Sequence, residues 1–147
     1  QSQLNHVLVI RSWIITGVVT VADNTNIDYE TATSCTVAVT ATSADSSTAV
    51  TTFTVAVTDI DEFDVGAPSD SNSGTNTMAE NVANAATVGV TAVATDADGT
   101  TNVISYTVTD QSCANVFTVG SSTGIVAVAD NSAIDYETAT SCTVEVT

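Results

Sequence analysis

The chain has almost no basic side chains. One Lys or Arg stands against 17 Asp and Glu in 147 residues, which gives a formal net charge of −16. Ion pairs can therefore neutralise almost none of the carboxylates, so water or a metal ion must do so. An acidic surface repels DNA, RNA and anionic lipid, and we expect no nucleic-acid partner.

Aromatic residues and long apolar runs are also scarce. Aromatics make up 5% of the chain, and no run of 18 apolar residues occurs, so we expect no membrane span. Strong charge with few aromatics can signal disorder. Here, however, 44% of residues are hydrophobic and Val, Thr and Ala dominate, which favours β-strands. The length fits one domain or two small ones.

The chain contains an internal repeat. The stretch "TGVVTVADNTNIDYETATSCTVAVT" (16–40) returns as "TGIVAVADNSAIDYETATSCTVEVT" (123–147), identical at 20 of 25 positions with an offset of 107 residues. A period that long indicates a repeated domain and not a solenoid unit of about 20–50 residues. We predict that residues 1–65 are the C-terminal part of one domain and residues 66–147 the N-terminal part of the next. The turn-rich stretch that holds the only proline, Pro68, follows this boundary.

Apolar and polar residues alternate with a period of two. In "TTFTVAVTD", Phe53, Val55 and Val57 share one face and threonines take the other, which is typical of a half-buried strand. The same alternation holds for Val37 and Val39, for Ile104, Tyr106 and Val108, and for Val144 and Val146. No segment has convincing helical spacing. Short strands between turn signals indicate an antiparallel β-sandwich.

The acidic residues gather where the predicted strands end. They form four groups: "IDYE" (Asp28 and Glu30, and again Asp135 and Glu137), "DIDEFD" (Asp59, Asp61, Glu62 and Asp64), "AEN" (Glu80) and "TDADG" (Asp96 and Asp98). Calcium takes six to eight oxygen ligands at roughly 2.3–2.6 Å and accepts carboxylates, carbonyls and water. Without a cation, two carboxylates 4 Å apart repel by about 1 kcal/mol even in water. A calcium site and a solvated acidic loop without an ion are both compatible with this pattern.

Five motifs in order resemble the cadherin repeat, in particular the tandem cadherin-like repeats of large bacterial surface proteins. They are "MAEN", "VATDADG", "ISYTVT", "AIDYE" and "VAVTDIDEFDVGAP", and the resemblance covers nearly the whole chain after residue 15. It implies an all-β fold of tandem antiparallel Greek-key β-sandwiches, both incomplete in this chain. It also implies that calcium ions between consecutive domains stiffen the chain.

The resemblance further implies which residues bind calcium. The internal junction would use Asp28, Glu30, Asp59, Asp61, Glu62, Asp96 and Asp98, and the next junction would use Glu80, Asp135 and Glu137. Two features depart from the family pattern. Phe63 replaces the final Asn of the linker, and the first domain lacks the segment that carries the first-strand Glu.

The cysteines predict one disulfide. Cys113 and Cys142 belong to the same repeat, and Cys142 shares the inward face with the valines that follow it. A bond that closes about 30 residues would stabilise the fold by roughly 3–4 kcal/mol and would indicate a location outside the cytosol. Cys35 is the repeat equivalent of Cys142, but His6 occupies the position equivalent to Cys113, so we expect Cys35 to be free or to bridge to another chain. Three buried thiols are the alternative.

The stretch "GSSTG" (120–124) matches the Gly-x-Ser-x-Gly pattern of hydrolases, with Ser122 at its centre. That site needs a strand-to-helix turn and a His after the Ser. The only His, His6, precedes it, so a hairpin turn is the better interpretation and we expect no enzymatic activity.

Together these features predict a calcium-stiffened structural or adhesive repeat protein of the cell surface or extracellular space: a stalk, adhesin or filament subunit. The expected partners are other copies or neighbouring repeats, arranged head to tail, and a cell-surface or matrix ligand. The alternative is a self-assembling fibre subunit that is completed by strand exchange between copies, without a dedicated adhesion ligand. In that case the apolar segment "HVLVIRSWII" (6–15) is the expected inserting strand.

Overall fold

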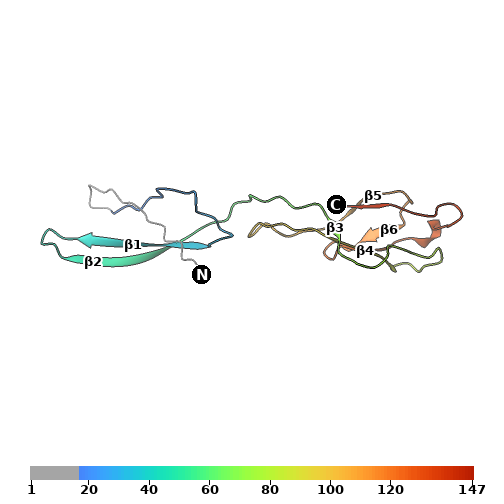
Figure 1. Cartoon of the computed structure of the whole chain (residues 1–147), viewed down its shortest axis with the longest axis horizontal. Coiled ribbons are helices and arrows are strands. Elements are labelled where there is room, and N and C mark those ends of the chain that lie inside the picture. Colours follow the sequence, from blue (N-terminus) through green and yellow to red (C-terminus); the bar gives the residue numbers. More distant parts are fainter. Residues whose placement is uncertain (1–16) are drawn as a thin grey trace. The chain divides into compact units, whose positions relative to one another are not determined.

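The computed structural model describes residues 17–147, which fall into two compact units (Figure 1). The first unit ends at Asp61, and the second covers Glu62–Thr147. All strand pairs are antiparallel, and no α-helix occurs in the described part of the chain. The predicted all-β architecture is confirmed, whereas the predicted inserting strand (6–15) lies outside the described residues.

The first unit is built around one hairpin. Strand β1 (Ser34–Thr42) pairs with β2 (Thr48–Ala56) in an unbroken register along both strands. The connecting loop is fixed by Asp45, whose Oδ1 accepts hydrogen bonds from the backbone N (3.0 Å) and hydroxyl (2.7 Å) of Ser47. This local turn brings two strands together that are rich in Val and Thr.

The hairpin has an apolar face that is largely exposed. Phe53 and Val55 share one face of β2, as the alternation predicts, and the pairing places Val37 and Cys35 opposite them on the same face of the hairpin. Phe53 is 51% exposed and Val55 53% exposed. No described residue of the first unit is buried. Among residues 17–61, no second sheet covers this face as one does in a sandwich.

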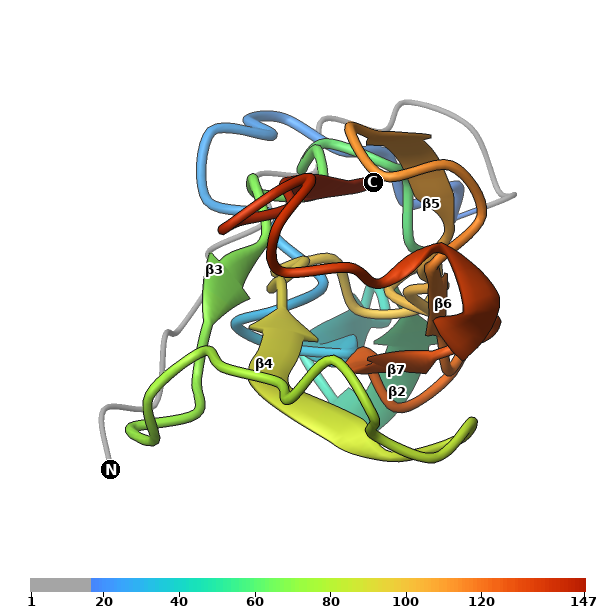
Figure 2. The same cartoon turned by 90° about the vertical axis from the view of Figure 1, so that its right-hand side faces the viewer.

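The second unit contains two sheets (Figures 1 and 2). The larger sheet has the order β3 (Ser69–Asp70), β4 (Thr87–Val93), β7 (Ile125–Val128) and β6 (Phe117–Val119). The smaller sheet pairs β5 (Val108–Gln111) with β8 (Val144–Val146). A short 3-10 helix, η1 (Asn131–Ala133), follows β7.

The two sheets of the second unit face each other across a core. Its buried residues are Val88, Val116, Phe117, Val126 and Val128, of which Val116 and Val126 are fully buried. The inward valines of β8 pack against this cluster. Burial of apolar side chains between two antiparallel sheets is the arrangement of a β-sandwich.

The strand predicted at 104–109 is shorter than the alternation indicates. β5 begins at Val108, and its pairing with the β8 segment extends only one residue further, through mutual backbone hydrogen bonds between Thr107 and Thr147 (2.8 and 2.9 Å). The reason is Tyr106, a buried residue whose backbone N donates to the carbonyl of Ser121 (2.8 Å) and whose hydroxyl accepts from the backbone N of Ala94 (3.0 Å). These long-range bonds hold Tyr106 across the sandwich and outside the β5–β8 ladder.

The "GSSTG" segment is the turn between β6 and β7, as predicted. Gly120 N donates to the carbonyl of Ile125 (2.9 Å), and Gly124 N donates to the carbonyl of Gly120 (2.8 Å). Gly124 has φ +66°, and a Cβ there would collide with the carbonyl oxygen of Ala92. The glycines therefore allow the tight hairpin turn, and Ser122 is exposed at its tip.

Candidate metal centre

The "IDYE" motif folds into the same acidic turn in both units. Asp28 accepts hydrogen bonds from the backbone N of Glu30 (3.0 Å) and from the hydroxyl of the following threonine (2.8 Å). Asp135 accepts the equivalent bonds from Glu137 and its following threonine, at 3.1 Å and 2.8 Å. The turn is thus a local property of the repeated sequence.

These bonds also tune the acidity of the two aspartates. The hydroxyl of Thr31 is the main cause that lowers the pKa of Asp28 below its ordinary value, and the hydroxyl of Thr138 does the same for the pKa of Asp135. Hydrogen bonds to the charged form favour that form. Both carboxylates are exposed and stay ionised to lower pH than a free Asp, which suits them to bind a cation.

In the second unit, Glu80 lies beside this acidic turn. One carboxylate oxygen from each of Glu80, Asp135 and Glu137 lies within 4.8 Å of the other two. Glu80 also accepts a hydrogen bond from the backbone N of Tyr136, at 3.4 Å. No Lys or Arg occurs anywhere in residues 17–147. Three carboxylates at this separation repel one another in water, and a divalent cation would convert that repulsion into attraction.

Glu80 is held in place by the segment around it. Asn131 donates from its side chain to the carbonyl of Val82 (2.8 Å), and its backbone N donates to the side-chain oxygen of Asn84 (2.9 Å). These two bonds fix the loop after Glu80 against the start of η1, six residues before Glu137. The sequence analysis missed Asn131, because its partners lie almost 50 residues away and no local pattern marks them.

The seven residues predicted for the internal junction fall into two sets. Asp28, Glu30, Asp59 and Asp61 belong to the first unit, and Glu62, Asp96 and Asp98 belong to the second. Within the first unit, one carboxylate oxygen of Glu30 lies within 4.8 Å of one of Asp59.

The second set is organised around Asp98, which is only 1% exposed. Its Oδ2 accepts a hydrogen bond from the backbone N of Glu62 (3.0 Å), and its own backbone N donates to Oδ1 of Asp96 (3.0 Å). The side chain of Asn102 closes the loop by donating to the carbonyl of Asp98 (2.7 Å). A buried carboxyl group needs hydrogen-bond partners, and these bonds hold Asp98 in a fixed position beside the linker.

Asp70 is a further organised carboxylate that sequence analysis did not single out. It accepts bonds from the backbone N of Thr91 (3.0 Å) and of Asn72 (3.0 Å), and from the side chain of Asn76 (3.1 Å). The bond from Thr91 is the main cause that lowers its pKa. Asp70 therefore anchors β3 and its following turn to β4, which is a structural role. The short pattern "SDSNSG" was its one local signal.

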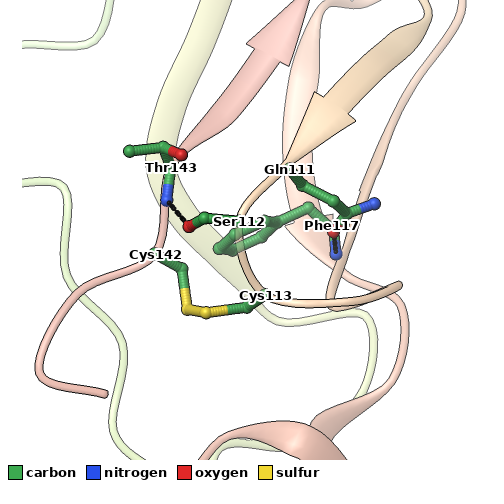
Figure 3. The surroundings of a disulfide bond; sticks show 6 residues. All are labelled: Gln111, Ser112, Cys113, Phe117, Cys142 and Thr143. Atoms are coloured by element: carbon green, nitrogen blue, oxygen red, sulfur yellow. Dashed lines mark hydrogen bonds between the residues drawn. A yellow bond between two sulfur atoms is a disulfide. The ribbon is translucent and has the colours of Figure 1, made fainter.

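The second unit contains a disulfide between Cys113 and Cys142, the pair that the sequence predicts (Figure 3). Their Cα atoms are 5.5 Å apart. Beside it, the hydroxyl of Ser112 accepts a hydrogen bond from the backbone N of Thr143, at 2.8 Å. The disulfide ties the loop after β5 to the segment that joins the acidic turn to β8. Cys35 is a free, half-buried thiol.

Comparison with known proteins gives a likeness in structure. No family model matches the chain, and no curated protein matches it. The solved structure of protocadherin gamma B2 extracellular cadherin domains 3–6 matches 81% of this chain at TM-score 0.59 and 23% identity, over 30% of its own length. Mouse protocadherin-24 EC1–3 matches 81% at TM-score 0.60 and 20% identity, over 37% of its length. Mouse cadherin-23 EC22–24 matches 77% at TM-score 0.53 and 22% identity, over 34% of its length.

The chain thus spans about a third of the length of each of these three solved structures. In residues 17–147 the structure has no helix of the length and apolarity that a membrane crossing needs. The antiparallel sheets, the sandwich core of the second unit and the matches to several cadherin structures agree with one another. The chain has a cadherin-like fold.

Proposed function

We propose that the chain is a calcium-binding structural or adhesive repeat protein of the cell surface or extracellular space, without enzymatic activity. The observation that carries this proposal is the cluster of Glu80, Asp135 and Glu137 in the second unit. It offers three carboxylates within 4.8 Å in a part of the chain that has no basic residue. Such a cluster is stabilised by a cation and destabilised without one.

The donor set suits calcium better than other common metals. All the donors are oxygens, and three carboxylates supply up to six of the six to eight that calcium takes. Zinc sites are built mainly from Cys and His, but the two cysteines near this cluster are bonded to each other. Magnesium demands near-ideal octahedral geometry and retains several waters. Exposed carboxylates on two separate loops do not impose that geometry.

We extend the proposal to the internal junction. The seven carboxylates that the resemblance to cadherin repeats assigns to it are Asp28, Glu30, Asp59, Asp61, Glu62, Asp96 and Asp98. Two observations support it: the "IDYE" turn of the first unit repeats that of the second, and Asp98 is buried and held by the backbone of the linker residue Glu62. Bound calcium there would stiffen the linker, as a stalk, adhesin or filament requires.

The disulfide supports an oxidising location outside the cytosol. One similar structure is described as a protocadherin gammaB7 cis-dimer, and we expect this chain also to associate with other copies or with neighbouring repeats. A cell-surface or matrix ligand would complete an adhesive role. The hairpin turn at Ser122 gives no support to a hydrolase, since the only His precedes it by more than 100 residues.

Calcium titration by calorimetry tests the assignment of the cluster. Glu137→Gln removes one charge from it, and we expect calcium affinity to fall by about tenfold or more, because even outer-shell changes cost metal sites that much. Glu145→Gln is the matched control: Glu145 is exposed on β8, outside the cluster, where it accepts a bond from the hydroxyl of Thr109. Equal affinity in the two variants would exclude this cluster as the binding site.

A further inference from the structure

The acidic turn of the second unit is an exposed segment between two better-buried residues. All residues from Asp135 to Ser141 are exposed, and the half-buried Ile134 and Cys142 flank them. The hydrogen bonds within the turn fix its shape, as the equivalent bonds do in the first unit. They do not fix its distance from Glu80, which lies on a different loop. That distance depends on bonds between the two loops.

One residue joins the two loops by two hydrogen bonds. The side-chain nitrogen of Asn131 donates to the carbonyl oxygen of Val82 (2.8 Å), and its backbone N donates to Oδ1 of Asn84 (2.9 Å). We call Val82, Asn84 and Asn131 the asparagine clip. Val82 is two residues after Glu80, and Asn131 is four residues before Asp135. The clip therefore limits how far Glu80 can move away from the acidic turn.

The direct contact between Glu80 and the turn is longer. The Glu80 carboxylate accepts from the backbone N of Tyr136 at 3.4 Å, whereas good N–H···O bonds span about 2.7–3.2 Å. Without a cation, the carboxylate of Glu80 also repels those of Asp135 and Glu137. The two short bonds of the clip therefore oppose a separation that the carboxylates themselves favour.

The hydrogen-bond partners define which end of each asparagine amide is used. A carbonyl oxygen only accepts, so the side chain of Asn131 presents its NH₂ group to Val82. A backbone N–H only donates, so Asn84 presents its oxygen to Asn131. Aspartate has the shape of asparagine, but an ionised aspartate only accepts. It can replace Asn84 in the clip but cannot replace Asn131.

The first unit offers a control position for the clip. Asn24 is the repeat equivalent of Asn131, and its carbonyl accepts from Ile27 N (3.1 Å) as that of Asn131 accepts from Ile134 N (3.2 Å). The side chain of Asn24 is exposed and makes no hydrogen bond within the part of the chain that the structure describes. A substitution of Asn24 therefore tests the same residue in the same local turn without the clip.

We propose that Asn131 and Asn84 are positioning residues of the calcium site formed by Glu80, Asp135 and Glu137. The clip holds Glu80 beside the acidic turn before the ion arrives, so binding does not have to order two separate loops. Preorganisation of this kind raises affinity by lowering the cost of ordering. This role rests on the proposed function and adds to it the residues that set the affinity.

The test measures calcium affinity at single amides of the full chain by ¹⁵N NMR, with calcium chloride as the titrant. Tyr136 N–H reports on Glu80 and Glu137 N–H reports on Asp135, because each donates to that carboxylate. The Glu30 amide, which donates to Asp28, is the internal control in the first unit. These reporters separate the cluster from any other calcium site in the chain.

The central comparison is between two aspartate substitutions. We expect Asn131→Asp to weaken calcium binding at the second-unit reporters by about tenfold, the lower end of the usual cost of outer-shell changes at metal sites. Asn84→Asp should not weaken it, because the acceptor oxygen remains. Both variants add one negative charge, so the added charge cannot explain a difference between them. Asn24→Asp should leave the second-unit reporters unchanged.

Two further variants separate positioning from a general loss of structure. Asn84→Ala removes only an exposed acceptor, and we expect it to weaken calcium binding severalfold while the amide signal of the fully buried Val126 stays in place. Glu80→Ala removes the carboxylate through which the clip acts. In that background Asn131→Asp should cause no further loss of affinity, whereas general loosening of the unit would add to it.

The positioning role is overturned if Asn131→Asp and Asn84→Asp bind calcium equally, if Asn84→Ala binds as tightly as Asn84→Asp, or if Asn131→Asp causes its full loss in the Glu80→Ala chain. In each case the proposed function stands, because the amides of Tyr136 and Glu137 still respond to calcium in the wild type. If these two amides show no response to calcium in the wild type, the cluster is not a calcium site and both proposals are wrong.

Discussion

The same eleven residues form the same turn in both units but enter different strands. In 27–37 and in 134–144 the aspartate accepts the same bonds from the Glu backbone and the Thr hydroxyl. After the cysteine, the first copy continues as part of the nine-residue β1, paired with β2, and the second as the three-residue β8, paired with β5. Local sequence determines the turn, and long-range pairing determines the strand.

The two units also differ in how they bury their apolar residues. The valines of β8 pack on a core in which Val116 and Val126 are fully buried, whereas no described residue of the first unit is buried. Apolar alternation is equally clear in both. A strand face that alternates correctly therefore contributes stability only when another sheet covers it.

The largest expected effect compares one phenylalanine from each unit. Phe117 is 8% exposed in the core of the second unit, and Phe53 is 51% exposed on β2. We expect Phe117→Ala to lower the free energy of unfolding by about 3–5 kcal/mol, the usual cost of a buried Phe. Phe53→Ala should cost less than about 1.5 kcal/mol, because much of the ring is already in water. Denaturant unfolding followed by circular dichroism measures both, and similar losses would show that the described difference in burial is wrong.

A second comparison uses glycines that are equivalent in the repeat. Gly17 and Gly124 both have positive φ, at +51° and +66°. A Cβ on Gly124 would collide with the carbonyl oxygen of Ala92, but a Cβ on Gly17 would meet nothing within 4 Å. Gly17→Ala should therefore cost only the backbone strain, roughly 1–2 kcal/mol, and Gly124→Ala should cost clearly more, because the β4–β7 pairing must also shift.

Thermal unfolding of the two variants gives the comparison directly. The order of the two midpoints is the informative result. If Gly17→Ala proved as destabilising as Gly124→Ala, the close packing around the β6–β7 turn would not be the cause.

The smallest effect concerns acid stability. The pKa of Asp70 is lowered chiefly by the backbone N–H of Thr91, so its folded pKa lies below its unfolded pKa. Its contribution is therefore present above the unfolded pKa and is lost as the pH falls through the folded pKa. We expect Asp70→Asn to flatten the fall in stability below about pH 4. Asp45→Asn, whose pKa is lowered within the first unit by Ser47, should leave the acid unfolding of the second unit unchanged. Identical profiles for wild type and Asp70→Asn would contradict the anchoring role.

Much of the fold follows from short-range patterns. Alternation predicted that Phe53 shares a face with Val55 and that the valines of β8 point inward, and the glycines of 120–124 predicted a turn. These features depend on neighbours within a few residues. Tyr106 lies outside the observed strand because it forms hydrogen bonds with Ser121 and Ala94. These partners are distant in sequence, so an alternation pattern cannot predict them.

The candidate site also combines parts that local sequence determines with parts that depend on long-range contacts. The acidic turns are local, and the sequence indicated them through Asp28 and Asp135. Only the resemblance to cadherin repeats implied that Glu80 lies near the acidic turn, which is more than 50 residues later in the sequence. In the structure, carboxylate oxygens of Glu80 and of this turn lie within 4.8 Å of one another. None of the motifs indicated the hydrogen bonds that Asn131 forms with the loop after Glu80, and only the structure shows them.

Differential scanning calorimetry of the whole chain, in calcium and in EDTA at matched ionic strength, tests the proposed function most directly. A ligand that binds only the folded state stabilises it in proportion to the logarithm of its concentration, by about 2.7 kcal/mol at 100 times its dissociation constant. We predict that the unfolding temperature rises with calcium concentration and falls to a common value in EDTA. Superimposable curves in calcium and EDTA would contradict a calcium-binding role for these carboxylates.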